Sequence, residues 1–93
     1  MKGINKEKFR MTNKDVTAKG MDLTKSDLKN FDLQATDLKY GKFYYSNLKA
    51  TDYSQSDLTG CSFKCSNLDD AVFYGASLNK AIFDKSDLKN ASF

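Results

Sequence analysis

Residues 21–93 read MDLTK SDLKN FDLQA TDLKY GKFYY SNLKA TDYSQ SDLTG CSFKC SNLDD AVFYG ASLNK AIFDK SDLKN ASF when the chain is divided into groups of five. The third residue of every group, from Leu23 to Phe93, is Leu, Phe or Tyr, although only 40% of the sequence is hydrophobic. We call this position the centre. Its unbroken recurrence indicates internal repeats, which decide the fold before any other signal.

A period of five fits neither an α-helix nor a flat strand. Residues five apart step about 140° around a helix, so the centres would be spread over its whole surface. Side chains of a strand alternate between its faces, so an odd spacing sends successive centres to opposite sides. The period therefore predicts a chain that bends once per group and points every centre to a common axis, as in a solenoid.

The other positions of the group agree with this prediction. The residue two before the centre is mostly small, as in Ser26, Thr36 and Ala71, and it shares the inward side of the centre. Between the two lies an outward position, mostly Asp, Asn or Ser. The two residues after the centre are mixed and polar, which is typical of a turn.

Groups such as Ser26-Asp27-Leu28 and Ser66-Asn67-Leu68 resemble the A(D/N)LxX motif of the pentapeptide repeat family. The resemblance covers residues 21–93 and, in part, residues 16–20. It implies an all-β fold, a right-handed quadrilateral β-helix with four groups to a coil and about 3.65 coils. The sequence supports four groups per coil independently, because every fourth centre places Leu over Leu and aromatic residues mostly over aromatic residues.

The N-terminal segment, residues 1–20, does not follow the period. It holds Ile4, Phe9, Met11 and Val16 among many charged residues. A chain of 93 residues fits a single domain. We therefore expect an irregular N-terminal leader or cap at residues 1–20, followed by a pentapeptide repeat β-helix at residues 21–93.

The C-terminal end shows no capping sequence and stops on a centre. Val72 and Ile82 nearby occupy the outward position, which is polar in most groups. We expect end-to-end association of two copies, a homodimer through the C-terminal coil. The expected interface consists of Val72, Ile82, Phe83, Leu88 and Phe93. A truncated chain or a frayed last group would show the same features.

Residues for catalysis or for holding a cofactor are missing from the sequence. Without histidine, Ser-His and Cys-His nucleophile pairs are excluded, and there is no glycine-rich phosphate loop. Two cysteines without histidine argue against zinc. Cys61 falls at an inward position and is expected to be a buried, reduced thiol, whereas Cys65 lies at a turn. We predict a non-enzymatic protein with no catalytic, cofactor-binding or metal-binding residues.

The family resemblance raises one specific activity, DNA mimicry. Members that protect bacteria from quinolones bind DNA gyrase and topoisomerase IV through a strongly negative surface. Duplex DNA of comparable length carries roughly ten charges, whereas residues 21–93 hold nine Lys and ten acidic residues. A local acidic face formed by Asp32, Asp37, Asp52 and Asp57 keeps this alternative open. The favoured explanation is that these aspartates bond to their own turns.

Partners and location follow from charge and hydropathy. The basic residues of the leader are dispersed among polar ones, so we expect a solubilising segment and no nucleic acid partner. No apolar run approaches the ~20 residues of a membrane span. The resemblance implies a bacterial, cytoplasmic protein.

One cluster of residues interrupts the repetition. Tyr40, Lys42, Tyr44 and Tyr45 surround Gly41, and the three tyrosines fall at turn positions. Exposed tyrosines with basic neighbours are common in protein-binding patches. An equally open explanation is that the rings lie flat over the coils. The sequence therefore favours a protein–protein interaction or structural module that presents flat β-helix faces, to a protein partner of unknown identity.

Overall fold

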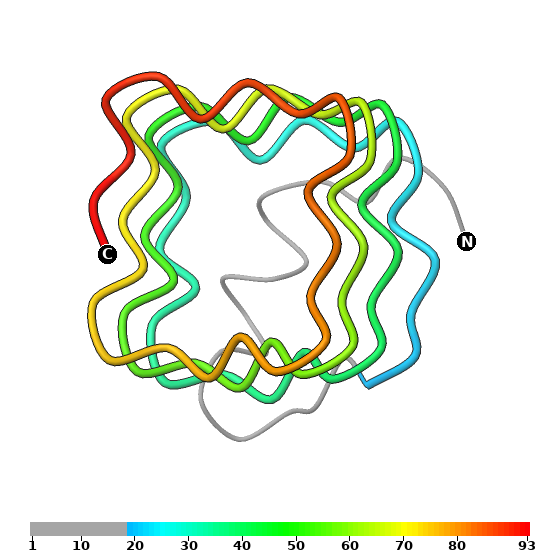
Figure 1. Ribbon diagram of the computed structural model, residues 1–93, viewed down its shortest axis with the longest axis vertical. Helices are drawn as coiled ribbons and strands as arrows, with labels where there is room; N and C mark the ends of the chain where they lie inside the picture. Colours follow the sequence, from blue (N-terminus) through cyan, green and yellow to red (C-terminus); the bar gives the residue numbers. More distant parts are fainter. Residues whose placement is uncertain (1–18) are drawn as a thin grey trace.

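A computed structural model gives the fold of residues 19–93, which wind into a square coil (Figure 1). The regular hydrogen bonding already includes Gly20, whose amide donates to the carbonyl of Lys39 at 2.7 Å. The repeat therefore begins at least one turn residue before residue 21. The expected cap, apart from residues 19 and 20, lies outside the described residues, as does the partial repeat at residues 16–18.

Neighbouring coils are joined by parallel β-bridges between residues that are 20 apart. The first joins Asp22 to Lys42, and the series continues through every outward position to the bridge between Val72 and Ser92. Each bridge is isolated, so residues 19–93 contain neither a helix nor an extended strand. A step of 20 residues is four groups to a coil, as the matched columns of centres predicted.

The four sides of the square are numbered in chain order. Face 1 comprises residues 21–25, 41–45, 61–65 and 81–85; face 2, 26–30, 46–50, 66–70 and 86–90; face 3, 31–35, 51–55, 71–75 and 91–93; face 4, 36–40, 56–60 and 76–80. Face 1 lies on the right in Figure 1 and face 3 opposite, on the left. The trace runs anticlockwise while it approaches the viewer, which is the right-handed sense.

A tight turn forms each corner of the square. The residue two after the centre has a positive φ of 53–70° at every fifth position from Gly20 to Asn90. The next amide donates to the carbonyl of the centre, for example from Ser86 to Phe83 at 3.0 Å. A single positive φ at the third residue defines a type II turn. Most of these corners hold residues other than glycine, so the stacked coils maintain a backbone conformation that costs free energy locally.

The centres fill the interior, as predicted. Every centre from Leu23 to Phe73 is at most 2% exposed. The centres towards the C-terminal end are less protected, because Leu78, Phe83 and Leu88 are only partly buried. The fully enclosed core therefore ends at Phe73, within the third coil.

Aromatic centres stack ring upon ring between coils. Phe43 and Phe63 have their ring centroids 5.0 Å apart at 11°, and Tyr53 and Phe73 5.2 Å apart at 12°. Rings on adjacent faces meet edge to face, as in Phe43 and Tyr53 at 80°. Both arrangements are favourable for aromatic pairs, and they confirm the expected aromatic columns.

The coils are also tied by what we call the inward ladder. In five successive groups, the hydroxyl or thiol two before the centre donates to the carbonyl 23 residues earlier. The pairs are Ser46 to Leu23, Thr51 to Leu28, Ser56 to Leu33, Cys61 to Leu38 and Ser66 to Phe43. Alanine follows at the next three inward positions, 71, 76 and 81, and brings no donor. The ladder therefore supports the middle of the stack and not its last coil.

Candidate functional site

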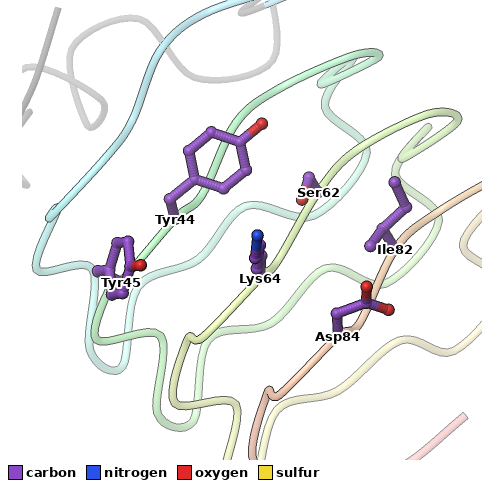
Figure 2. A pocket seen from close by; sticks show the side chains of 6 residues that line it. All are labelled: Tyr44, Tyr45, Ser62, Lys64, Ile82 and Asp84. Atoms are coloured by element: carbon purple, nitrogen blue, oxygen red, sulfur yellow. The ribbon is translucent and has the colours of Figure 1, made fainter.

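Face 1 carries a shallow hollow of about 430 Å³, which we call the face-1 groove (Figure 2). It is lined by Tyr44, Tyr45, Ser62, Lys64, Ile82 and Asp84. These residues come from three successive coils, so the groove runs along the axis of the stack.

The repeat places the lining residues in columns. The first residues after the centre stack 20 apart, and they are Tyr44, Lys64 and Asp84. In the neighbouring outward column, Ser62 is bridged to Lys42 on one side and to Ile82 on the other. Ser62 is short and only 8% exposed, whereas its neighbours in the column are long. The hollow therefore arises where a small outward residue interrupts a row of larger ones.

The groove combines apolar and charged groups. Figure 2 shows the two tyrosines on one side, Ile82 and Asp84 on the other, and Lys64 between them. The ion pairs that the structure records between residues 19–93 involve Lys39, on face 4. The charges of Lys64 and Asp84 are thus available to a bound group. This lining suits contact with a protein surface and contains no nucleophile–base pair.

The predicted interaction patch is divided by the structure. Tyr44 and Tyr45 line the groove, whereas Lys42 does not, and Tyr40 lies at the corner between faces 4 and 1. The ring of Tyr40 covers Gly60 in the next coil, because a Cβ built on Gly60 would lie 2.5 Å from its Cδ1. Tyr40 nevertheless remains 53% exposed. Tyr40 thus agrees with the explanation that a ring lies over the coils, whereas the interaction patch stays a prediction.

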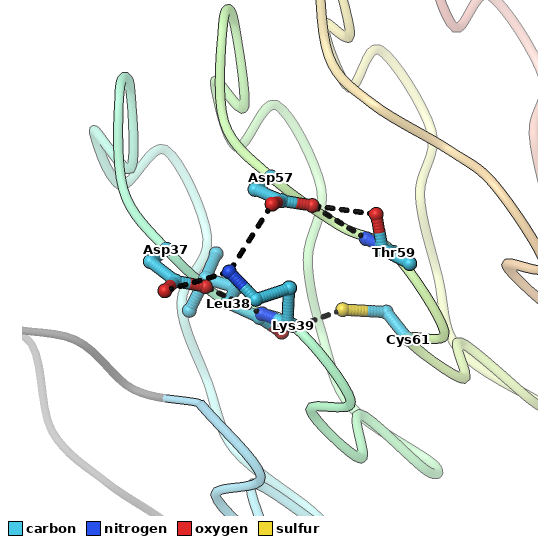
Figure 3. Close-up of polar contacts among 6 residues, drawn as sticks. All are labelled: Asp37, Leu38, Lys39, Asp57, Thr59 and Cys61. Carbon is cyan, nitrogen blue, oxygen red and sulfur yellow. Dashed lines mark hydrogen bonds and ion pairs between the residues drawn. The ribbon is translucent and has the colours of Figure 1, made fainter.

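The predicted acidic face is partly neutralised. The Nζ of Lys39 lies 3.0 Å from the Asp37 carboxylate and 3.3 Å from that of Asp57 in the next coil (Figure 3). Hydrogen bonds from the side chain and backbone of Thr59, followed by that from Lys39, lower the pKa of Asp57. The hydrogen bonds to Asp37 and Asp57 raise the pKa of Lys39. Lys39 therefore joins two coils and offsets part of the negative charge.

The other two acidic residues of that face bond to their own turns. Oδ1 of Asp32 accepts the amide of Gln34 at 3.0 Å, and Oδ1 of Asp52 accepts that of Ser54 at 2.9 Å. Seven further outward Asp and Asn residues do the same with the amide two residues on. The expected structural role of the outward aspartates is confirmed.

Both cysteines are free, and Cys61 is buried as predicted. Its Sγ lies 2.8 Å from the carbonyl oxygen of Leu38 (Figure 3), and burial raises the pKa of this thiol to about 12. Cys65 is half-buried at a corner. Within residues 19–93, no cluster of three His, Cys, Asp or Glu side chains is placed to hold a metal ion. The same part of the chain has no helix with the length and hydropathy to cross a membrane.

The residues predicted for an end-to-end interface do not form one surface. Phe83, Leu88 and Phe93 belong to the last layer, where Phe93 is 62% exposed. Val72 and Ile82 are outward residues of faces 3 and 1 and point sideways. Ile82 lines the groove. The end-to-end interface stays a prediction.

Three lining residues were missed by the sequence reasoning, namely Ser62, Lys64 and Asp84. The signal was present, because the step of 20 residues that sorts the centres also sorts the outward and turn residues into columns. The same step places Tyr44, Lys64 and Asp84 in one column.

The square stack of five-residue groups defines the class of the protein, a repeat solenoid, and comparison with known proteins shows which repeat it resembles. Residues 54–90 match the family model of pentapeptide repeats, in eight copies. This match confirms the resemblance to pentapeptide repeat proteins that the sequence predicted. No curated protein matches it.

Solved structures of pentapeptide repeat proteins share the fold. The protein alr5209 from Nostoc Pcc 7120 has a TM-score of 0.85 at 22% identity, covering 98% of this chain and 75% of that one. A protein from the Arabidopsis thaliana thylakoid lumen has a TM-score of 0.70 at 20% identity, covering 75% and 49%. One from the cyanobacterium Cyanothece 51142 has a TM-score of 0.50 at 25% identity, covering 82% and 62%. The chain thus spans about half to three quarters of these proteins, and the likeness concerns the fold.

Proposed function

We propose that this protein is a non-enzymatic interaction module that binds a protein partner through the face-1 groove. The observation that carries the proposal is the groove itself, a hollow of about 430 Å³ lined by two tyrosines, an aliphatic side chain and two opposite charges. Backbone hydrogen bonds between coils hold this face in place. A pre-organised surface loses little conformational entropy on binding, which favours affinity.

Capture of host proteins tests the proposal. Immobilised wild type should retain a partner that the Tyr44→Ala variant loses, because the ring forms one wall of the groove. The matched control is Tyr74→Ala, since Tyr74 is 56% exposed at the same turn position but on face 3. Circular dichroism should show that both variants keep the wild-type fold. Equal retention of the partner by all three proteins would contradict the assignment of the groove.

DNA mimicry with a type II topoisomerase such as gyrase has less support. Lys39 pairs with two of the four acidic residues in question, and residues 21–93 carry almost equal numbers of Lys and acidic residues. We expect no inhibition of gyrase supercoiling at micromolar protein. Inhibition that disappears in the Asp32→Asn, Asp52→Asn double variant would reverse this ranking.

We also propose that the last layer associates with a second copy of the chain. The support is the partial exposure of Phe83 and Leu88 and the 62% exposure of Phe93. The bacterial, cytoplasmic location stays a prediction, and fractionation of the host would test it.

A further inference from the structure

We infer that the segment bound in the face-1 groove is an acidic, extended peptide that carries an apolar side chain. The inference rests on the proposed interaction function and adds the chemistry of the partner. It stands on the charge of the four faces and on the order of groups along the groove.

Charge is distributed unevenly around the square. Face 1 holds four lysines and two aspartates: Lys25, Lys42, Lys64, Lys85, Asp22 and Asp84. The opposite face 3 holds Asp32 and Asp52 and no basic residue. Face 2 carries one more acidic than basic residue, and face 4 carries equal numbers. Within residues 21–93, the groove therefore lies on the face with net positive charge, which steers an acidic segment towards it.

The order of groups along the axis matches the spacing of side chains in an extended peptide. Lys42 is bridged to Ser62, which lies on the same coil as Lys64. Lys42 and Lys64 therefore belong to neighbouring coils, which are about 4.8 Å apart. Alternate side chains of an extended peptide lie about 7 Å apart on one side, so two acidic residues can reach Lys42 and Lys64. Tyr44 and Ile82 border the same hollow and offer apolar contact to a side chain between them.

Asp84 gives the site a direction. It lies in the same column as Lys64, one coil further along, so it disfavours a carboxylate at that end of the groove. A backbone amide or hydroxyl of the peptide can donate to it instead. The acidic residues of the peptide should therefore lie towards Lys42 and Lys64, and its uncharged end towards Asp84.

Fluorescence anisotropy with labelled, end-capped ten-residue peptides tests the inference. The first peptide has Asp and Glu at one end, a central Leu pair and uncharged polar residues at the other end; the second replaces the Leu pair by Ser, and the third replaces the acids by Lys. We expect binding of the first, about tenfold weaker binding of the second, and none of the third. Higher salt should weaken the first interaction, because exposed charges are screened.

A charge reversal locates the site. Lys64→Glu should weaken the first peptide by at least about tenfold. Lys29→Glu should leave it unchanged, because Lys29 is exposed at the same turn position on face 2. In NMR spectra of the wild type, the peptide should shift the amides of Tyr44, Lys64 and Ile82.

Several outcomes would overturn the inference: no binding at about 1 mM peptide, equal affinity for the acidic and basic peptides, equal effects of the two reversals, or displacement of the peptide by a DNA duplex. Loss of the host partner by Tyr44→Ala without peptide binding would reject the acidic partner and leave the interaction function standing. If neither partner capture nor peptide binding depends on the groove, both the interaction function and the acidic partner are rejected.

Discussion

Replacement of three corner glycines by alanine separates two contributions to the free energy of unfolding: the backbone conformation of the turns and the side-chain contacts between coils. Gly20, Gly60 and Gly75 occupy equivalent corners with φ of +70°, +69° and +68°. Among residues 19–93, nothing lies within 4 Å of a Cβ built on Gly20. A Cβ on Gly75 would meet Gln55 Cγ at 3.3 Å, and one on Gly60 would meet the Tyr40 ring at 2.5 Å.

The magnitudes follow from two separate effects. Alanine in a left-handed conformation costs about 1–2 kcal/mol, and the smaller freedom of the unfolded chain offsets about 0.4–1 kcal/mol of this. Both effects are common to the three sites, so Gly20→Ala should lower the free energy of unfolding by about 1 kcal/mol. At Gly60 the Tyr40 ring must also move away from the backbone that it covers, to make room for the new Cβ. Tyr40 is 53% exposed, so losing its half-buried contact adds about 1 kcal/mol.

Urea unfolding followed by tyrosine fluorescence and circular dichroism measures these differences. We expect Gly60→Ala to cost about 2 kcal/mol, Gly20→Ala about half as much, and Gly75→Ala an intermediate amount. In a Tyr40→Ala background the extra cost of Gly60→Ala should vanish, which gives a coupling of about 1 kcal/mol. Equal losses at Gly20 and Gly60, or an unchanged cost of Gly60→Ala without the Tyr40 ring, would refute the reasoning.

Three further predictions concern the thiol, the inward ladder and the last layer. Because burial holds the folded-state pKa of Cys61 near 12, above its ordinary value of 9.0, stability is complete below pH 9 and falls as the pH rises towards 12. Between pH 8 and 10.5 the free energy of unfolding should drop by about 2 kcal/mol more in the wild type than in Cys61→Ser, and parallel curves would exclude this origin. Ser66→Ala removes the donor to the Phe43 carbonyl and should cost about 1–2 kcal/mol in urea unfolding, whereas the same change at the half-buried turn residue Ser54 should cost less. Sedimentation should give the mass of a dimer for the wild type and of a monomer for Phe93→Lys, and a monomeric wild type would reject the proposed association.

The coil was predictable because one residue in five carries most of the signal. Leu23 and its successors fix the inward side, and the step of 20 residues follows from the match of Phe43 with Phe63 and of Tyr53 with Phe73. The turns were predictable as turns. Their positive φ at residues such as Lys25 was not, because the residue types at that corner range from lysine to tyrosine and no single one reports the conformation.

The groove was only partly predictable. Tyr44 and Tyr45 stand out in the sequence, but the hollow depends on Ser62, an ordinary residue that matters only because it lies between Lys42 and Ile82 in a column. The pairing of Lys39 with Asp57 likewise joins residues 18 apart, and it depends on a side-chain conformation that no spacing specifies. Local sequence thus predicts the layers, whereas the contacts between layers can be predicted only when the register and the side-chain rotamers are known.

The end of the inward ladder at Ser66 divides the molecule into parts of unequal local stability. In the last coil, the hydroxyl of Ser86 donates to Phe83 in its own turn, and alanines replace the other donors. Fewer bonds hold that coil, so it should open first, and its amides should exchange with solvent without global unfolding. Ile82 and Asp84 lie on this labile coil, while Tyr44 lies on a coil that the ladder secures. A partner bound across the groove would therefore hold the labile coil closed, and slower hydrogen exchange there would report its arrival.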